Sequence, residues 1–205
     1  MTTPAKTPGK YAAHLTYGVP SAAPEGGIPF WEIFPYEGEL SIKAIEDPVI
    51  PEPPRGGEGG RECGECARGD DDGYVWTDAN WRLSARREPE ALVTLLLTPR
   101  GHYDSGDLPA GLSAELGPVM QRVENAMMGL GDIARVHMSK WGDGGSHLHW
   151  WFFARPEGLM QFRGTCLALW GDVLPPLPRE LWEESLASIA SQMTATGGET
   201  AGQVV

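Results

Sequence analysis

The ten residues at 146–155 constrain the fold more than any other stretch of this chain. They read Ser-His-Leu-His-Trp-Trp-Phe-Phe-Ala-Arg, with histidines at alternate positions followed by four aromatic residues in a row. Successive side chains of a strand point to opposite faces, so a strand here places His147, His149 and Trp151 on one face. We therefore expect a strand at 147–154 with two imidazoles and an indole sharing one wall.

Period-two and helical patterns place further elements around that strand. Short apolar or alternating runs bounded by turn residues predict further strands at 74–76, 81–83, 91–97 and 135–141. One helix is expected from a capping Ser113 to Gly129 or Gly131, and another from Pro178 to about Met193. Glycine and proline together make up about a fifth of the chain, which disfavours a helical bundle. These elements predict an α+β fold.

Composition divides the chain into five segments. Residues 1–27 lack apolar periodicity, and we expect a flexible arm there. Residues 28–60 hold an aromatic cluster (Phe30–Tyr36), an alternating run that predicts a strand (Leu40–Ala44), and a Pro/Gly-rich linker. The remaining segments are a main domain at 61–165, a C-terminal helical extension at 166–193 and a polar tail at 194–205.

The charge balance excludes some partners. Sixteen Lys and Arg against 28 Asp and Glu give a net charge of −12, so the overall field repels long nucleic acids. A small phosphorylated substrate stays open, because one pocket can gather a few basic side chains. No apolar run approaches the length of a membrane helix, the N-terminus has no signal-peptide pattern, and three cysteines are too few for a disulfide framework. We expect a cytoplasmic protein without a membrane partner.

The first constellation with chemistry is Cys63-Gly-Glu-Cys66 together with His102 and His147. A C-x-x-C turn supplies two soft thiolates, and two imidazoles from later in the chain can complete a closed, structural zinc site. The alternatives are a reduced surface pair or a redox pair, although a thioredoxin-like motif needs a βαβ context that is absent here. Spacing alone leaves these readings open.

The second constellation is the strand with His147 and His149, preceded by the glycine loop Gly142-Asp-Gly-Gly145. Such a loop turns tightly and can point several N–H groups toward an anion. A nucleophilic histidine beside it indicates phosphorus chemistry. The alternative is that both histidines are hydrogen-bonded polar residues of an aromatic strand.

These motifs resemble the histidine triad (HIT) superfamily. The stretch at 147–155 is similar to its active-site strand, His-φ-His-φ-His-φ-φ, and Pro99-Arg100-Gly-His102 is similar to its strand ending in Pro-Lys-x-His. Asp78-Ala-Asn-Trp-Arg-Leu and the following Pro-Glu-Ala-Leu are closer to the galactose-1-phosphate uridylyltransferase branch than to the small phosphoramidate hydrolases. The resemblance covers about residues 61–165. It implies an antiparallel sheet with a long helix packed on it, followed by a C-terminal helix.

The resemblance also implies a mechanism and its residues. His149 takes the place of the nucleophile that carries a covalent nucleotidyl intermediate, in a nucleotidyl or phosphoryl transferase or a hydrolase of a small, nucleotide-type phosphorylated substrate. Zinc-bearing members place a structural zinc at the positions of Cys63, Cys66, His102 and His147. The residues expected to bind substrate are Lys140, Gly144, Gly145, Ser146, Trp151 and Arg155. Relatives often form homodimers, which makes a homodimer a further expectation.

The chain departs from the family pattern at three places. The glycine loop at 142–145 is shorter than usual and lacks the Asn and Gln that flank phosphate in many relatives. Trp151 stands at the third triad position, and an indole has one N–H donor and no acceptor, so it cannot shuttle a proton to a leaving group. Arg86 and Arg87 stand where nucleotide-hydrolysing members carry an acidic ribose-binding residue. Two alternatives follow: a catalytically inactive, zinc-stabilised module that binds a ligand or a protein, and a HIT-like enzyme repurposed for chemistry without phosphorus.

Overall fold

A computed structural model describes residues 18–19, 31–36, 38, 40, 43–69 and 73–200. Three short helices or turns, two long helices and five strands make up the described elements. In chain order they are η1 (Trp31–Ile33), α1 (Gly64–Arg68), β1 (Tyr74–Thr77), β2 (Trp81–Ala85), β3 (Thr94–Pro99), α2 (Ala110–Met128), β4 (Ile133–Ser139), β5 (Trp150–Pro156), α3 (Cys166–Val173) and α4 (Arg179–Thr194). The expected α+β class is confirmed.

The five strands form one antiparallel sheet in the order β1-β2-β3-β5-β4. β5 lies between β3 and β4, so the histidine-bearing segment enters the middle of the sheet. Within β5, alternate side chains point to opposite faces. Trp150 and Phe152 lie on the face that carries the main core, whereas Trp151 and Phe153 lie on the other.

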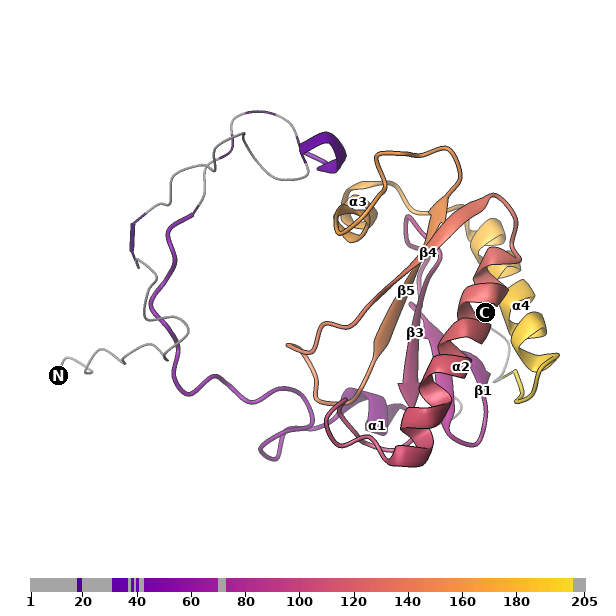
Figure 1. Ribbon diagram of the computed structural model, residues 1–205, viewed down its shortest axis with the longest axis horizontal. Coiled ribbons are helices and arrows are strands. Elements are labelled where there is room, and N and C mark those ends of the chain that lie inside the picture. The colour runs from indigo at the N-terminus through magenta and orange to yellow at the C-terminus, as the bar shows by residue number, and fades with distance from the viewer. Residues whose placement is uncertain are drawn as a thin grey trace.

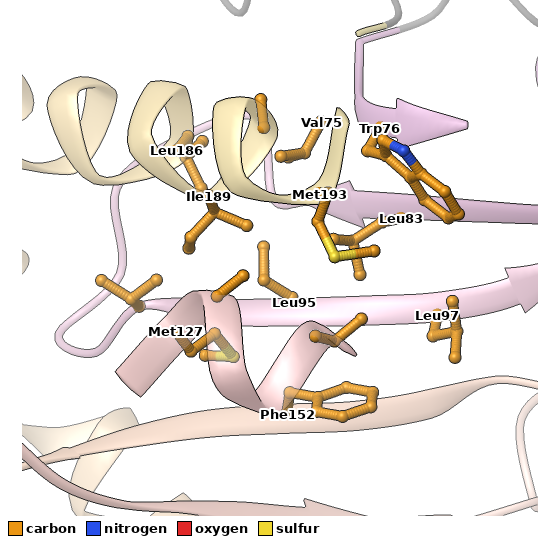
Figure 2. Close-up of a cluster of buried hydrophobic side chains, with 14 of the residues drawn as sticks. Val75, Trp76, Leu83, Leu95, Leu97, Met127, Phe152, Leu186, Ile189 and Met193 are labelled. Carbon is orange, nitrogen blue, oxygen red and sulfur yellow. The ribbon is translucent and has the colours of Figure 1, made fainter. Parts of the chain in front are cut away.

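The long helices α2 and α4 cover the first face (Figure 1). Apolar side chains from both helices meet those of the strands in one cluster, as Figure 2 shows for Met127, Leu186 and Ile189. The largest buried side chains include Trp76, Trp81 and Phe152, each at most 1 % exposed. Burial of this size is the main favourable term in folding, and it fixes the sheet on which the site is built.

The second face is covered in part by α3, on the side of the sheet away from α2 and α4 (Figure 1). Leu167 packs there with Leu92, Phe153 and Phe162 in a smaller cluster. The indole N–H of Trp170 in α3 donates to the carbonyl of Ile33 at 2.9 Å, which ties η1 to this layer. The part of the second face beyond α3 carries the site.

Several predicted bounds are corrected. The strands at 74–76, 81–83 and 135–141 are confirmed as β1, β2 and β4, with no bound shifted by more than two residues. The strand expected at 91–97 is β3, which begins at Thr94 and runs through Pro99. The strand expected at 147–154 begins only at Trp150, because His147 and Leu148 bond outside the ladder, to Pro99 and Tyr103.

The start of the long helix is also corrected. Ser113 is not its cap, since α2 begins at Ala110 after Pro109. The N–H of Ser113 donates to the Pro109 carbonyl at 2.8 Å, which is an ordinary bond of the first turn. Proline suits the start of a helix because its fixed φ and missing N–H cost nothing there. The expected end at Gly129 and the expected helix from Pro178 are confirmed.

The two ends of the chain are described only in part. Of the predicted arm at 1–27, all but Gly18 and Val19 lie outside the described residues, as do Phe30 and Ile42 of the next segment. The described part of 28–60 holds η1 and isolated bridges, with none of the named strands. Near the other end, Glu199 forms a two-way backbone bridge with Thr77 of β1, so the polar tail reaches the sheet. No helix in the described ranges is long and apolar enough to cross a membrane.

Candidate metal centre and nucleophile

Four metal-ligating side chains from three separate segments meet at one end of the sheet. Cys63 caps α1, Cys66 lies within it, His102 follows β3, and His147 precedes β5. Their ligand atoms all lie within 4.8 Å of one another. The Sγ atoms of Cys63 and Cys66 both lie 3.5 Å from Nδ1 of His147, and Cys66 Sγ lies 3.4 Å from Nδ1 of His102. The structure thus brings together all four residues of the first constellation.

The hydrogen bonds of the two rings fix which nitrogen faces the sulfurs. Nε2 of His147 lies 2.8 Å from the carbonyl oxygen of Pro99, which can only accept, so this nitrogen carries the proton. The Ser146 hydroxyl donates to the Gly56 carbonyl at 3.1 Å and therefore accepts from Nε2 of His102 at 3.2 Å. Both Nδ1 atoms are left with lone pairs that point at the two sulfurs. Such outer partners are typical of metal-ligating histidines.

Burial favours the neutral forms of these side chains when no cation is bound. It lowers the pKa of His147, and together with the neighbouring Cys63 it raises the pKa of the Cys66 thiol to about 11. Redox-active C-x-x-C pairs have the opposite shift, toward an easily formed thiolate. A divalent cation would supply the positive charge that stabilises two thiolates, and neutral imidazoles are what such an ion binds. The donor set fits a tetrahedral metal site.

His149 lies two residues beyond the last ligand, in the segment that leads into β5. Its side chain is half-buried, and Nδ1 lies 2.8 Å from the carbonyl oxygen of His147. Because that oxygen only accepts, Nδ1 carries the proton and Nε2 keeps its lone pair. The ring stands edge-on to Trp151, with 6.4 Å between centroids. A neutral imidazole held in this tautomer is a competent nucleophile.

Two of the expected substrate-binding side chains are already engaged by other residues. Lys140 forms an ion pair with Asp104 at 3.2 Å, and Asp104 also pairs with Arg55 at 2.9 Å. Burial alone would raise the pKa of Asp104, but hydrogen bonds from the Ser105 backbone, Arg55 and Lys140 lower it to about 2. Ser146 is buried and holds His102, as described above.

The glycine loop is occupied on one side by the chain before the cysteines. Gly56 donates its N–H to the carbonyl of Gly144 at 3.1 Å and accepts from the N–H of Ser146 at 2.9 Å, and it forms a parallel bridge with Gly145. The neighbouring Gly57 has a φ of +88°, and a Cβ there would lie 2.5 Å from the ring of His102. The linker predicted at 48–60 therefore ends against the metal cluster, where only glycine fits.

Arg155 lies away from this group. It is six residues beyond His149 at the far end of β5, about 20 Å along an extended strand. Its guanidinium donates to the carbonyls of Pro156 and Leu159, at 3.5 and 3.3 Å. The structure does not bring Arg155 to His149.

A cavity of about 500 Å³ opens beside Trp151. Trp141 and Phe153 also line it; Trp151 stacks on Phe153 with 5.8 Å between centroids and 6° between planes. Arg86 lies 5.3 Å from the Trp151 ring centroid and pairs with Glu90 at 3.2 Å. Arg86 and Trp151 were named from the sequence as departures from the family pattern. Trp141, which follows β4, was not predicted to share a cavity with them.

Sequence comparisons find no match: no family model and no curated protein matches the chain. Solved structures do match its fold. A hypothetical histidine triad nucleotide-binding protein from Sulfolobus tokodaii has a TM-score of 0.50 at 17% identity, covering 65% of this chain and 93% of that one. A histidine triad protein from Bradyrhizobium japonicum has a TM-score of 0.49 at 19% identity (58% and 89% covered), and a Zn-bound histidine triad family protein from Mycobacterium smegmatis has 0.47 at 20% (64% and 92%). The likeness to the Sulfolobus tokodaii protein shows the fold alone, and the chain has a HIT-like fold, as expected.

Proposed function

We propose that this chain belongs to the histidine triad superfamily and transfers or hydrolyses a nucleotidyl or phosphoryl group through His149. The substrate is a small phosphorylated molecule of nucleotide type. The neighbour from Sulfolobus tokodaii with the same fold is described as nucleotide-binding, and we carry that ligand class over to this chain. Within the superfamily we place it nearest the galactose-1-phosphate uridylyltransferase branch, on the strength of Asp78-Ala-Asn-Trp-Arg-Leu.

One observation carries the proposal: the hydrogen bond between His149 Nδ1 and the His147 carbonyl, at 2.8 Å. It leaves the Nε2 lone pair free on a ring that is only half-buried. In the proposed step, Nε2 attacks phosphorus, a P–N bond forms, and the bond to the leaving oxygen breaks with its electron pair on that oxygen. Water or a second phosphate then attacks phosphorus, and the P–N electrons return to Nε2.

Trp151 restricts the leaving group. A poor leaving group needs a proton from a nearby acid, and an indole N–H is far too weak an acid to supply one. We therefore expect a leaving group that is stable as an anion, such as a phosphate or pyrophosphate oxygen. We assign Arg86, whose guanidinium lies over the Trp151 ring, as the cation that contacts the substrate in the cavity beside Trp151.

We propose that the ion held by Cys63, Cys66, His102 and His147 is zinc and that its role is structural. The set of two thiolates and two imidazoles is one that zinc prefers, and four protein ligands leave no open position for water. When bound, such an ion fixes the segment before β5 and so the position of His149. Metal analysis of the purified wild-type protein and of Cys63→Ser tests this separately from activity.

The test of function is detection of the covalent intermediate. The protein is incubated with dinucleoside polyphosphates, nucleotide sugars, adenosine phosphoramidate and adenylyl sulfate, quenched, and measured by intact mass spectrometry. We expect a nucleotidyl adduct in the wild type and none in His149→Ala. Ser113→Ala is the control, because Ser113 is on α2 with its hydroxyl bonded to the Leu108 carbonyl, and this variant should keep the adduct.

A second candidate is a binding module without turnover. It is favoured by the engagement of Lys140 with Asp104 and of Ser146 with His102, which removes two expected phosphate ligands. The two candidates differ in outcome: saturable ligand binding with neither adduct nor turnover across the panel supports the module and contradicts transfer. Reuse of the aromatic cavity for a substrate without phosphorus would give turnover that survives in His149→Ala.

We further propose a cytoplasmic homodimer. β4 is at one edge of the sheet, and an edge strand can pair with the same strand of a second copy of the chain. Sedimentation equilibrium measures the mass directly, and a mass of one chain at micromolar concentration contradicts the dimer.

A further inference from the structure

A second cavity runs along the outer strand β4 and shares Trp141 and Phe153 with the cavity beside Trp151. Its volume is about 590 Å³. Five consecutive residues of β4, from Arg135 to Ser139, line one wall. Of these, Arg135, His137 and Ser139 are on the face of the sheet that α3 covers. Gly164 and Thr165, which precede α3, line the other. The lining within the described chain contains no carboxylate, although the chain as a whole has a net charge of −12.

Two arginines face each other next to this cavity. Arg135 of β4 is directly opposite Arg155 of β5 in the strand register, and both point to the cavity face. Like charges at directly opposed positions are destabilising. Arg155 is only 8 % exposed, and its guanidinium has two weak bonds to backbone carbonyls. Within the described ranges neither arginine has a carboxylate within ion-pair distance.

His137 adds a third nitrogen donor beside the pair. It follows Arg135 on the same face of β4, opposite Phe153. Burial and the charge of Arg155 lower the pKa of His137, which means that its surroundings are short of negative charge. A bound anion would oppose the effect of the Arg155 charge on the pKa of His137.

The start of α3 faces the cavity from the other side. α3 has eight residues, and the Thr165 side chain makes no capping hydrogen bond there. The first N–H groups of a helix lack internal partners and carry partial positive charge, which favours an anion. This terminus adds to Arg135 on the opposite wall.

We propose that this cavity is a binding site for a tetrahedral oxyanion, a phosphate or a phosphomonoester group, held by Arg135 and His137. Arg135 supplies the fork-shaped donors that such oxygens match, and Arg155, which does not line the cavity, adds its positive charge from the opposed position on β5. This site does not depend on His149.

The test follows the His137 ring by two-dimensional NMR at constant ionic strength while inorganic phosphate is added. The ring signal is assigned by its loss in His137→Gln. We expect a saturable shift of that signal with a millimolar Kd. Loss of one charged hydrogen-bond donor costs about 1.5 to 3 kcal/mol, so Arg135→Met should weaken phosphate binding by roughly tenfold or more.

Arg163→Met is the matched control, because Arg163 is an exposed arginine of the loop before α3 that does not line the cavity. It loses the same charge and should bind phosphate like the wild type. Arg135 is itself exposed, so its substitution should preserve the circular dichroism spectrum. A linear, unsaturated shift in the wild type, or equal affinity in Arg135→Met, overturns the proposal. Phenyl phosphate in place of phosphate distinguishes a free ion from a phosphomonoester, and His149→Ala should leave both titrations unchanged.

Discussion

At the scale of single residues, the site depends on the hydrogen bonds that set histidine tautomers. His102 and His147 each bind a partner through Nε2 and present Nδ1 to the cysteines, whereas His149 donates from Nδ1 and keeps Nε2 free. The three histidines thus differ in tautomer: His102 and His147 carry the proton on Nε2, and His149 carries it on Nδ1. The hydrogen-bond partner of each ring decides which nitrogen keeps the lone pair that is available to a metal or to phosphorus.

Ser146 should therefore act on the metal and not on a substrate phosphate. Removing its hydroxyl in Ser146→Ala frees Nε2 of His102, and loss of such an outer partner lowers metal affinity by about 10- to 100-fold. Competition against a chromophoric zinc chelator measures the change. Ser113→Ala, which removes a hydroxyl bonded to the Leu108 carbonyl on α2, should leave the affinity unchanged. Unaltered zinc affinity in Ser146→Ala would contradict this role.

At the scale of elements, α1 is five residues long and has no buried apolar residue of its own. It is held on the sheet by the carboxylate of Glu65, the residue between the cysteines. Glu65 accepts from the hydroxyls of Tyr74 and Thr98 at 2.9 Å each. Both of those residues are buried, at 0 % and 3 % exposed. These two hydrogen bonds thus hold α1 on the sheet, as apolar packing holds α2 and α4.

Glu65→Ala should accordingly be costly. It leaves two buried hydroxyls without their partner, which lowers the free energy of unfolding by about 2 to 4 kcal/mol. Glu65→Gln keeps one acceptor oxygen and should lose less than half as much. Urea denaturation measures both, with Glu88→Ala, whose side chain is 76 % exposed, as the control near zero. Equal stability of the wild type and Glu65→Ala would show that α1 is held in another way.

Elements with a strong pattern of their own could be predicted from the sequence, and those that depend on distant partners could not. α4 has a clear apolar period, and its bounds were predicted to within one residue, whereas β2 was predicted correctly at its start and ends two residues later than expected. α1 and η1 are short, and their bonds run to β1, β3 and α3, which no local pattern reveals. The strand predicted from His147 begins three residues later, because His147 and Leu148 bond to Pro99 and Tyr103 instead of pairing in the sheet.

The same distinction holds within the site. Residue types and order were enough to predict that Cys63, Cys66, His102 and His147 come together. The places of Lys140 and Ser146 could not be predicted, because each depends on a partner far away in the chain, Asp104 and Gly56. The place of Arg155 depends on strand pairing, which sets it opposite Arg135 and away from His149.

At the scale of the whole molecule, the metal cluster joins three segments that are far apart in the sequence. Bound metal should therefore stabilise the entire domain and not α1 alone. A ligand that binds only the folded state adds about 2.7 kcal/mol at a free concentration about 100 times its Kd. For a chain of this length, that amounts to roughly 5 to 11 °C in Tm.

Chelation by a strong zinc ligand such as EDTA should lower Tm by that amount in the wild type, and readdition of zinc should restore it. Cys63→Ser should have a low Tm from the start and no response to the chelator. His149→Ala, which leaves all four ligands in place, should respond like the wild type. Differential scanning calorimetry measures all three. A wild-type Tm unaffected by removal of the bound metal would mean that the cluster does not stabilise the folded domain.

The bridge between Glu199 and Thr77 bears on how the chain is made. Trp76 on β1 donates its indole N–H to the carbonyl of Gly197, and α4 packs over the same strand. Gly197 lies 121 residues beyond Trp76 in the sequence, so this contact joins the first described strand to a segment that is synthesised much later. Until residues 197–199 and α4 are in place, β1 and its tryptophan lack this cover, and the partly folded protein exposes a hydrophobic surface there.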